Sequence, residues 1–151
     1  MKMGRSLHRQ KGAEVVEFAI SATLLFILLF GIIEFSVALF DKATLTNASR
    51  EGARTGILFR PPIESLGTRD LAAEDAAIEQ AVRDYAEQYL ISLGGEAQMD
   101  IAIERSDEAM SPGSDVTVTV DYPYQYLVLP GFIGDLGGVL NLSSITVMRA
   151  E

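Results

Sequence analysis

The stretch that decides the fold lies at residues 12–40 and reads GAEVVEFAISATLLFILLFGIIEFSVALF. Between Glu17 and Glu34 it holds sixteen uncharged residues, and the apolar character resumes after Glu34 until Asp41. The last 23 residues of the stretch would form a helix of roughly 34 Å at ~1.5 Å per residue. That length is sufficient for a hydrocarbon core of about 30 Å, so we expect a membrane-spanning helix at residues 13–40.

Two other interpretations fit this stretch less well. A secretory signal has an apolar core of roughly 7–15 residues followed by a small-residue cleavage site, whereas here the run is longer and the pair Gly12-Ala13 precedes it. A buried core helix needs a globular domain around it, yet only eleven mainly polar and basic residues precede Gly12. Membrane insertion is therefore the better interpretation.

Charge predicts the orientation of this helix. The segment before Gly12 carries four basic residues and no acidic one: Lys2, Arg5, Arg9 and Lys11. By the positive-inside rule the N-terminus stays in the cytoplasm and the rest of the chain is exported.

The position of Glu17 at the head of the apolar run needs a reason, because a carboxylate in the middle of a membrane helix costs ~2.5–3.5 kcal/mol and less near its ends. One interpretation places Glu17 and Glu34 at the two membrane interfaces, since seventeen steps span roughly 26 Å. The other begins from the basic leader. If the chain is cut after Gly12, Glu17 becomes the fifth residue of the new chain.

This arrangement resembles the processing site of type IV pilins of the Flp or Tad class, which a membrane-embedded aspartyl prepilin peptidase cuts after the glycine. More specifically, the chain resembles the TadE-like pseudopilins, which join such a segment to a small exported domain. Three segments carry the resemblance: KGAEVVEFAI at residues 11–20, NASREGAR at 47–54 and ITVMRAE at 145–151.

The resemblance implies cleavage between Gly12 and Ala13 and an assembly role for Glu17, which the aromatic Phe18 follows. In the family the fifth-position glutamate is thought to neutralise the new N-terminal amine of a neighbouring subunit. Pairing two charges that are each costly in lipid works only at one helix stagger, so the pair would set register. The implied location is the inner membrane, single-pass, with a periplasmic or extracellular C-terminal domain that can be incorporated in a pilus.

The resemblance also implies the partners, which are prepilin peptidase, other pilin or pseudopilin subunits and the Tad inner-membrane assembly platform. Composition argues against nucleic acid as a partner. Without residues 1–12 the chain keeps eight basic and twenty-one acidic residues, a formal net charge of −13, whereas nucleic acid and anionic lipid need clustered positive charge.

Cysteine is absent, which excludes a disulfide framework and a thiolate metal site.

The helical pattern continues past the membrane to about residue 60. Small residues recur every fourth position in this continuation, and two arginines lie one turn apart with a glutamate between them. The small face lets another backbone approach closely, although glycines near a helix end can equally loosen it, at up to ~1 kcal/mol each relative to alanine. The candidate subunit-packing residues are Ala48, Arg50, Glu51, Gly52, Arg54 and Gly56.

Residues 61–151 predict a small α+β domain. After a proline-rich linker at residues 61–67, Asp70 predicts an N-cap, and a helical apolar period follows until Gly94-Gly95. We expect Tyr85 and Tyr89 to face the core, and we expect the acids of this helix to form a solvated face: Glu74, Asp75, Glu79, Asp84 and Glu87.

Three strands are predicted after that helix. The alternating apolar residues are Met99, Ile101 and Ile103, then Val116, Val118 and Val120, and finally Leu140, Leu142, Ile145 and Val147. We expect an antiparallel sheet covered on one face by the second helix. The apolar loop at residues 126–138 can be a contact site or can complete the core, and we favour burial.

No catalytic constellation is visible in the sequence. The only histidine, His8, lies in the leader, and there is no glycine-rich phosphate loop or EF-hand spacing. We expect no enzyme activity, no cofactor and no small-molecule substrate, and we consider calcium binding by Asp107, Glu108 and Asp115 unfavoured. The main hypothesis is a minor pilin or pseudopilin. The alternatives are an uncleaved membrane-anchored assembly or scaffold factor and an anchored ligand-binding or enzymatic domain.

Overall fold

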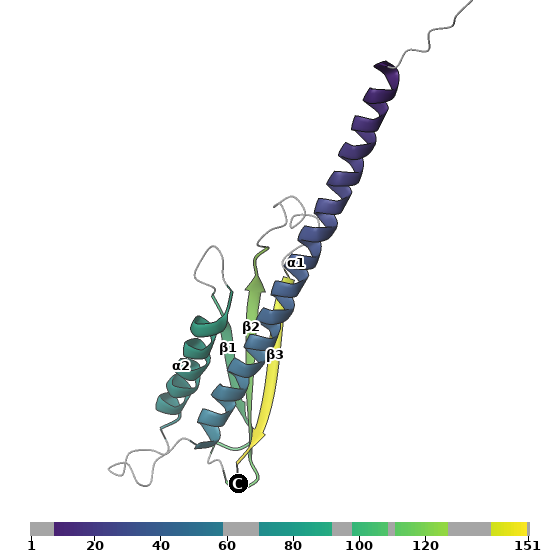
Figure 1. Cartoon of the computed structure of the whole chain (residues 1–151). Coiled ribbons are helices and arrows are strands. Elements are labelled where there is room, and N and C mark those ends of the chain that lie inside the picture. The colour runs from purple at the N-terminus through teal and green to yellow at the C-terminus, as the bar shows by residue number, and fades with distance from the viewer. Residues whose placement is uncertain (1–7, 59–69, 92–97, 109–110, 127–139, 151) are drawn as a thin grey trace, which may run out of the picture.

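The computed structural model describes residues 8–58, 70–91, 98–108, 111–126 and 140–150. It contains a long helix α1 (His8–Leu58), a second helix α2 (Leu71–Tyr89) and three strands, β1 (Asp100–Arg105), β2 (Asp115–Tyr124) and β3 (Leu140–Arg149). The second helix and the sheet form a head that lies along the lower half of α1 (Figure 1). The predicted α+β class, with a long apolar helix, a second helix and a three-stranded antiparallel sheet, is confirmed.

Helix α1 has two halves with different surroundings. It is continuous over 51 residues, about 76 Å at ~1.5 Å per residue. Nearly all side chains of residues 12–33 are exposed, and from Glu34 onward one face becomes buried at intervals of three or four residues. A single helix therefore joins a free apolar rod to a packed head (Figure 1).

Helix α2 begins as predicted, because the Asp70 side chain accepts a hydrogen bond from the backbone N–H of Ala73 at 3.1 Å. It ends earlier than predicted, at Tyr89, where the N–H of Leu90 bonds back to the carbonyl of Ala86. Tyr85 is partly buried against the core as expected, but Tyr89 is 46% exposed, so its predicted core position is wrong. The expected end at Gly94-Gly95 lies outside the described residues.

The sheet has the strand order β1-β2-β3, with both pairs antiparallel. The central strand buries Val116, Val118 and Val120 on the face that the helices cover. In β3, however, Ile145 and Val147 are 65% and 58% exposed on the opposite face. The reason is the period of two in a strand, which turns Leu142 and Ser144 inward and leaves the residues between them outside.

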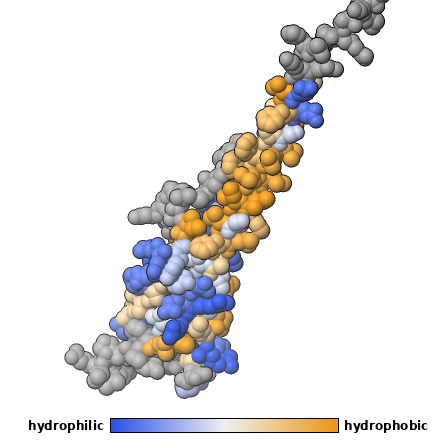
Figure 2. Space-filling model, viewed as in Figure 1, coloured by the Kyte–Doolittle hydropathy of each residue, from blue (hydrophilic) through white to orange (hydrophobic). Residues whose placement is uncertain are grey.

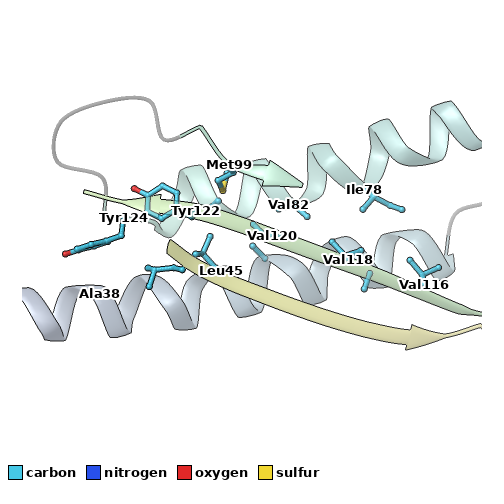
Figure 3. Close-up of a cluster of buried hydrophobic side chains, with 14 residues drawn as sticks. Ala38, Leu45, Ile78, Val82, Met99, Val116, Val118, Val120, Tyr122 and Tyr124 are labelled. Carbon is cyan, nitrogen blue, oxygen red and sulfur yellow. The ribbon is translucent and has the colours of Figure 1, made fainter. Parts of the chain in front are cut away.

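The core fills the space between α1, α2 and the sheet. Figure 3 shows its buried side chains along the helices, with Tyr124 and Ala38 at one end and Val116 at the other. Leu45 of α1, Ile78 and Val82 of α2 and the valines of β2 are fully buried. The expected covering of one sheet face is therefore made by α1 together with α2.

One acid of α2 belongs to the interior. Glu74 is fully buried, and its Oε1 accepts hydrogen bonds from Nε and Nη2 of Arg105 at 3.2 and 3.1 Å, while Nη2 also contacts Asp75. The expectation of a wholly solvated acidic face is wrong for Glu74, because β1 brings a guanidinium under the helix. The predicted linker at 61–67 and residues 127–138 of the apolar loop lie outside the described residues.

Candidate functional site

The residues of the predicted processing site lie on the free end of α1. Gly12, Ala13, Glu17 and Phe18 are all exposed, and no neighbour lies within 4 Å of a Cβ placed on Gly12. Ala13 and Glu17 are one turn apart, so both lie on one face of the helix. Glu17 makes no ion pair with any residue that the structure describes. The surface around these residues is therefore open to a molecule other than the head.

The rod above the head is covered by apolar side chains. Figure 2 shows hydrophobic residues gathered along the upper half of the molecule, whereas the head shows mainly hydrophilic residues with smaller hydrophobic patches. By length and composition α1 can cross a membrane, and no described part of the head packs on residues 12–33. The large exposed side chains include Phe18, Leu24, Phe26, Leu28 and Ile32. In water so much exposed apolar surface is unfavourable, so the rod requires lipid or other subunits around it.

The segment NASREGAR at residues 47–54 is divided by the helix into two faces. Its small residues Ala48, Ser49, Gly52 and Ala53 are buried, whereas Asn47, Arg50, Glu51 and Arg54 are exposed. A Cβ on Gly52 would lie 2.5 Å from Cγ2 of Val82, and one on Gly56 would lie 2.9 Å from Cδ1 of Ile78. Glycine thus lets α1 approach α2 closely at these two positions.

This packing changes the interpretation of the small face. The spacing predicts a close backbone approach, and the structure shows that α2 of the same chain makes it. In this structure α2 covers Gly52 and Gly56, and Ala48 is buried, so none of the three is open to a second subunit. Subunit packing therefore remains a prediction for the exposed Arg50, Glu51 and Arg54 only.

Two of the three segments that carry the family resemblance meet in the head. Ser49 of α1 is fully buried, and its hydroxyl lies 3.0 Å from that of Ser144 and 2.7 Å from that of Thr146 in β3. Thr146 belongs to the C-terminal segment at residues 145–151. The hydroxyls satisfy one another's hydrogen bonds in a buried place where unpaired polar groups are costly, so they fix α1 on β3.

Two carboxylates join the rod to the head. Glu34 is buried and accepts a hydrogen bond from the hydroxyl of Tyr124 at 2.6 Å. Two turns further on, Asp41 accepts a bond from the backbone N–H of Ile91 at 3.0 Å. The Oδ2 atom of Asp41 is buried and has no partner in the described part of the chain. Burial raises the pKa of Asp41 above its usual value, although the bond from Ile91 opposes this.

One of the two interpretations of the sequence placed Glu34 at a membrane interface, and Asp41 was identified only as the end of the apolar stretch. A signal was present, because Glu34, Asp41 and Ala48 follow one another every seven residues and therefore share one face of the helix. Carboxylates on the face that carries the small packing residues point toward the head rather than toward lipid.

These features, a free apolar rod headed by Gly12-Ala13 and a small-residue face that follows it, coincide with a family match. Residues 12–54 match the family model described as TadE-like protein. This segment of the chain is TadE-like. The resemblance drawn from KGAEVVEFAI and NASREGAR is thereby confirmed, and the match indicates a component associated with the Tad pilus. No curated protein and no solved structure matches the chain.

The TadE-like segment ends within the head. The described residues of the chain hold no group of three or more His, Cys, Asp or Glu side chains that could bind a metal ion. Two of the three acids considered for calcium have partners in the chain. Asp107 accepts hydrogen bonds from the backbone and side chain of Ser111, and Asp115 pairs with Arg149 at 2.8 Å. The TadE-like family comprises structural pilus components.

Proposed function

We propose that this chain is a minor pilin or pseudopilin of a Tad or Flp-type pilus, which serves surface attachment. In this proposal prepilin peptidase cuts between Gly12 and Ala13, α1 anchors the subunit in the inner membrane, and the head lies on the periplasmic side. The observation that carries the proposal is the free apolar half of α1, with Gly12-Ala13 at its head and Glu17 one turn further on.

Cleavage would create the charge that Glu17 needs. The new amine of Ala13 and the carboxylate of Glu17 are both costly in lipid, and each is offset when two subunits pair them. In one subunit the Ala13 amine and the Glu17 carboxylate lie at the start of the helix. At that end of the helix the amine can also reach the carboxylate of a neighbouring copy. The exposure of Glu17 is compatible with such an intersubunit pair.

The experiment measures the intact mass and N-terminal sequence of the protein recovered from membranes, with and without prepilin peptidase. We expect an N-terminus at Ala13 only when the peptidase is present. A Gly12→Leu variant should not be cut at this position. In the cleaved protein, Glu17→Ala should keep membrane insertion but reduce assembly. The matched control is Glu14→Ala, which removes an exposed carboxylate three positions earlier.

The alternative function is an uncleaved membrane-anchored scaffold factor for a pilus or secretion system. The head supports it, because the described part of the packed α+β structure contacts α1 only from Glu34 onward and does not involve the processing site. An N-terminus at Met1 or Met3 in the presence of active peptidase would overturn processing and favour this alternative.

A further inference from the structure

The head has two exposed faces of opposite character, which lie on opposite sides of the molecule. The helix face is the exposed side of α1, with Phe40, Asn47, Arg50, Glu51, Arg54 and Leu58. The sheet face is the side of the sheet turned away from the helices. Its acids are Asp100, Glu104, Asp115 and Asp121, of which Asp115 pairs with Arg149. Since α1 buries its other side on the inner surface of the sheet, the two faces point away from each other.

The helix face carries Arg50 and Arg54, the most weakly paired arginines of the described head, and Lys42, which lies outside this face, has no ion pair among the described residues. Elsewhere in the head, Arg83, Arg105 and Arg149 are each held by a carboxylate of the same chain. Arg50 instead has only a bond of 3.4 Å to the amide oxygen of Asn47, and Arg54 has a distant contact of 3.9 Å with Glu51. Both guanidinium groups are therefore available to an external carboxylate.

The sheet face carries unpaired negative charge. Asp100 of β1 and Asp121 of β2 are direct neighbours in the ladder, and both are exposed. Like charges directly opposite each other on one face of a sheet are destabilising. Neither carboxylate has an ion pair within the described residues. An external cation at this position would relieve their repulsion.

Both faces also expose apolar side chains. The sheet face has Ile145 and Val147, at 65% and 58% exposure, beside the acids. The helix face has Leu58 and Phe40, at 56% and 48%. Each face thus combines apolar surface with an excess of charge of one sign, which is positive on the helix face and negative on the sheet face.

We propose that the partner of the sheet face is the helix face of a second copy of this chain, with Arg50 and Arg54 of one copy against Asp100 and Asp121 of the next. Both faces extend along α1 (Figure 1), so copies anchored side by side by parallel α1 helices can bring them together. A contact between two different faces is heterologous, so its repetition adds subunits into a ring if the rotation closes and into an open helical filament if it does not. This inference deepens the proposed function, because it names a contact that assembly would use.

The test uses cross-linking of the full chain in membranes, because the chain has no cysteine and engineered thiols are unambiguous. Two differently tagged copies are co-expressed, one with Asn47→Cys on the helix face and one with Thr119→Cys in the centre of the sheet face, and treated with a short bismaleimide. We expect the mixed dimer to exceed both symmetric dimers. Gln88→Cys, on the exposed side of α2, is the matched control for Asn47→Cys.

Charge reversal then tests the cause of the contact. Arg50→Glu with Arg54→Glu in the Asn47→Cys copy should reduce the mixed dimer to the level of the Gln88→Cys control, and Asp100→Lys with Asp121→Lys in the other copy should restore it. Restoration also shows that the variants fold. An unchanged yield after reversal, a dominant symmetric dimer, or cross-linking of Thr119→Cys only to a different protein would overturn the proposal.

The N-terminus is read from the same samples, so that the two proposals fail separately. A chain that is cut at Ala13 but gives no mixed dimer retains the proposed function and loses this interface. A mixed dimer of uncut chains retains this interface and contradicts the processing step of the proposed function.

Discussion

The hydroxyl of Tyr124 donates a hydrogen bond of 2.6 Å to Oε1 of Glu34, across 90 positions of the sequence. Tyr124 is the last residue of β2, and Glu34 is the first fully inward-facing residue of α1 below the apolar rod. Burial and the neighbouring carboxylate of Glu34 raise the pKa of Tyr124 far above its usual value, so the phenol stays a donor. This bond fixes the place where the head begins on the helix.

Tyr124→Phe should lower the free energy of unfolding of the head by about 1.5–3 kcal/mol, the usual range for a hydrogen bond to a charged group. The phenyl ring keeps its packing, so the loss reports the hydroxyl. Thermal unfolding of the full chain in detergent measures it. Tyr89→Phe, at a half-exposed site, is the control and should be nearly neutral. Equal effects of the two variants would contradict the role of the bond.

Gly52→Ala should destabilise the head by about 1–3 kcal/mol, the usual cost of overpacking a core. The new methyl would lie 2.5 Å from a methyl of Val82, which has no flexible end to move away. Gly56→Ala is the matched comparison, because its Cβ meets Cδ1, the far end of the longer Ile78 side chain, at 2.9 Å. A gain of up to ~1 kcal/mol in helix propensity offsets part of that cost. Denaturant unfolding should therefore give a lower free energy of unfolding for Gly52→Ala than for Gly56→Ala.

Asp41→Asn should stabilise the head at neutral pH. It removes a buried charge whose Oδ2 has no partner in the described residues and keeps an oxygen for the N–H of Ile91. Because the folded pKa of Asp41 lies above the unfolded value of 3.8, the folded state binds more protons between these two values. The contribution of Asp41 to stability therefore rises as pH falls through that window.

Unfolding curves at several pH values check this prediction. The advantage of Asp41→Asn over the parent chain should shrink as the pH approaches 3.8. Glu87→Gln, at an exposed position of α2, is the control and should follow the parent. A constant advantage at all pH values would show that the charge of Asp41 is not its source.

Glu74→Ala should cost about 3–5 kcal/mol, the range for removing one partner of a buried ion pair. Arg105 has a side chain only 9% exposed, so it would lose its buried partner and keep only the contact with Asp75. The pair of Arg83 and Glu79 provides the comparison, because both side chains are more than 40% exposed. Glu79→Ala should change the stability by no more than ~1 kcal/mol. Chemical denaturation of both variants tests the contrast.

Local patterns predicted the elements of this fold well. The apolar run, the Asp70 cap and the alternating valines of β2 each depend on neighbours within a few residues, and each element forms where its pattern lies. Ile145 was harder, since a strand with apolar residues at mixed spacing does not reveal which side faces the core. The contact of Ser144 with Ser49 decides it, and that contact joins residues 95 positions apart.

The buried acids were not predictable for the same reason. Glu34, Asp41 and Glu74 look like interface or surface residues in sequence, and their partners lie 90, 50 and 31 positions away. Only the packing of the head on α1 brings these groups together. The same packing shows why the small residues of NASREGAR face inward while its arginines remain outside.

The parallel course of α1 and the strands has a mechanical consequence. A pull along α1 from the membrane end reaches the head through its contacts with β2 and β3, and both strands extend along the direction of the pull (Figure 1). Their ladder joins ten residue pairs from Asp115 to Tyr124, with hydrogen bonds perpendicular to the strands. Such a load acts on the ladder in shear, so that its bonds resist together instead of opening one by one from an end.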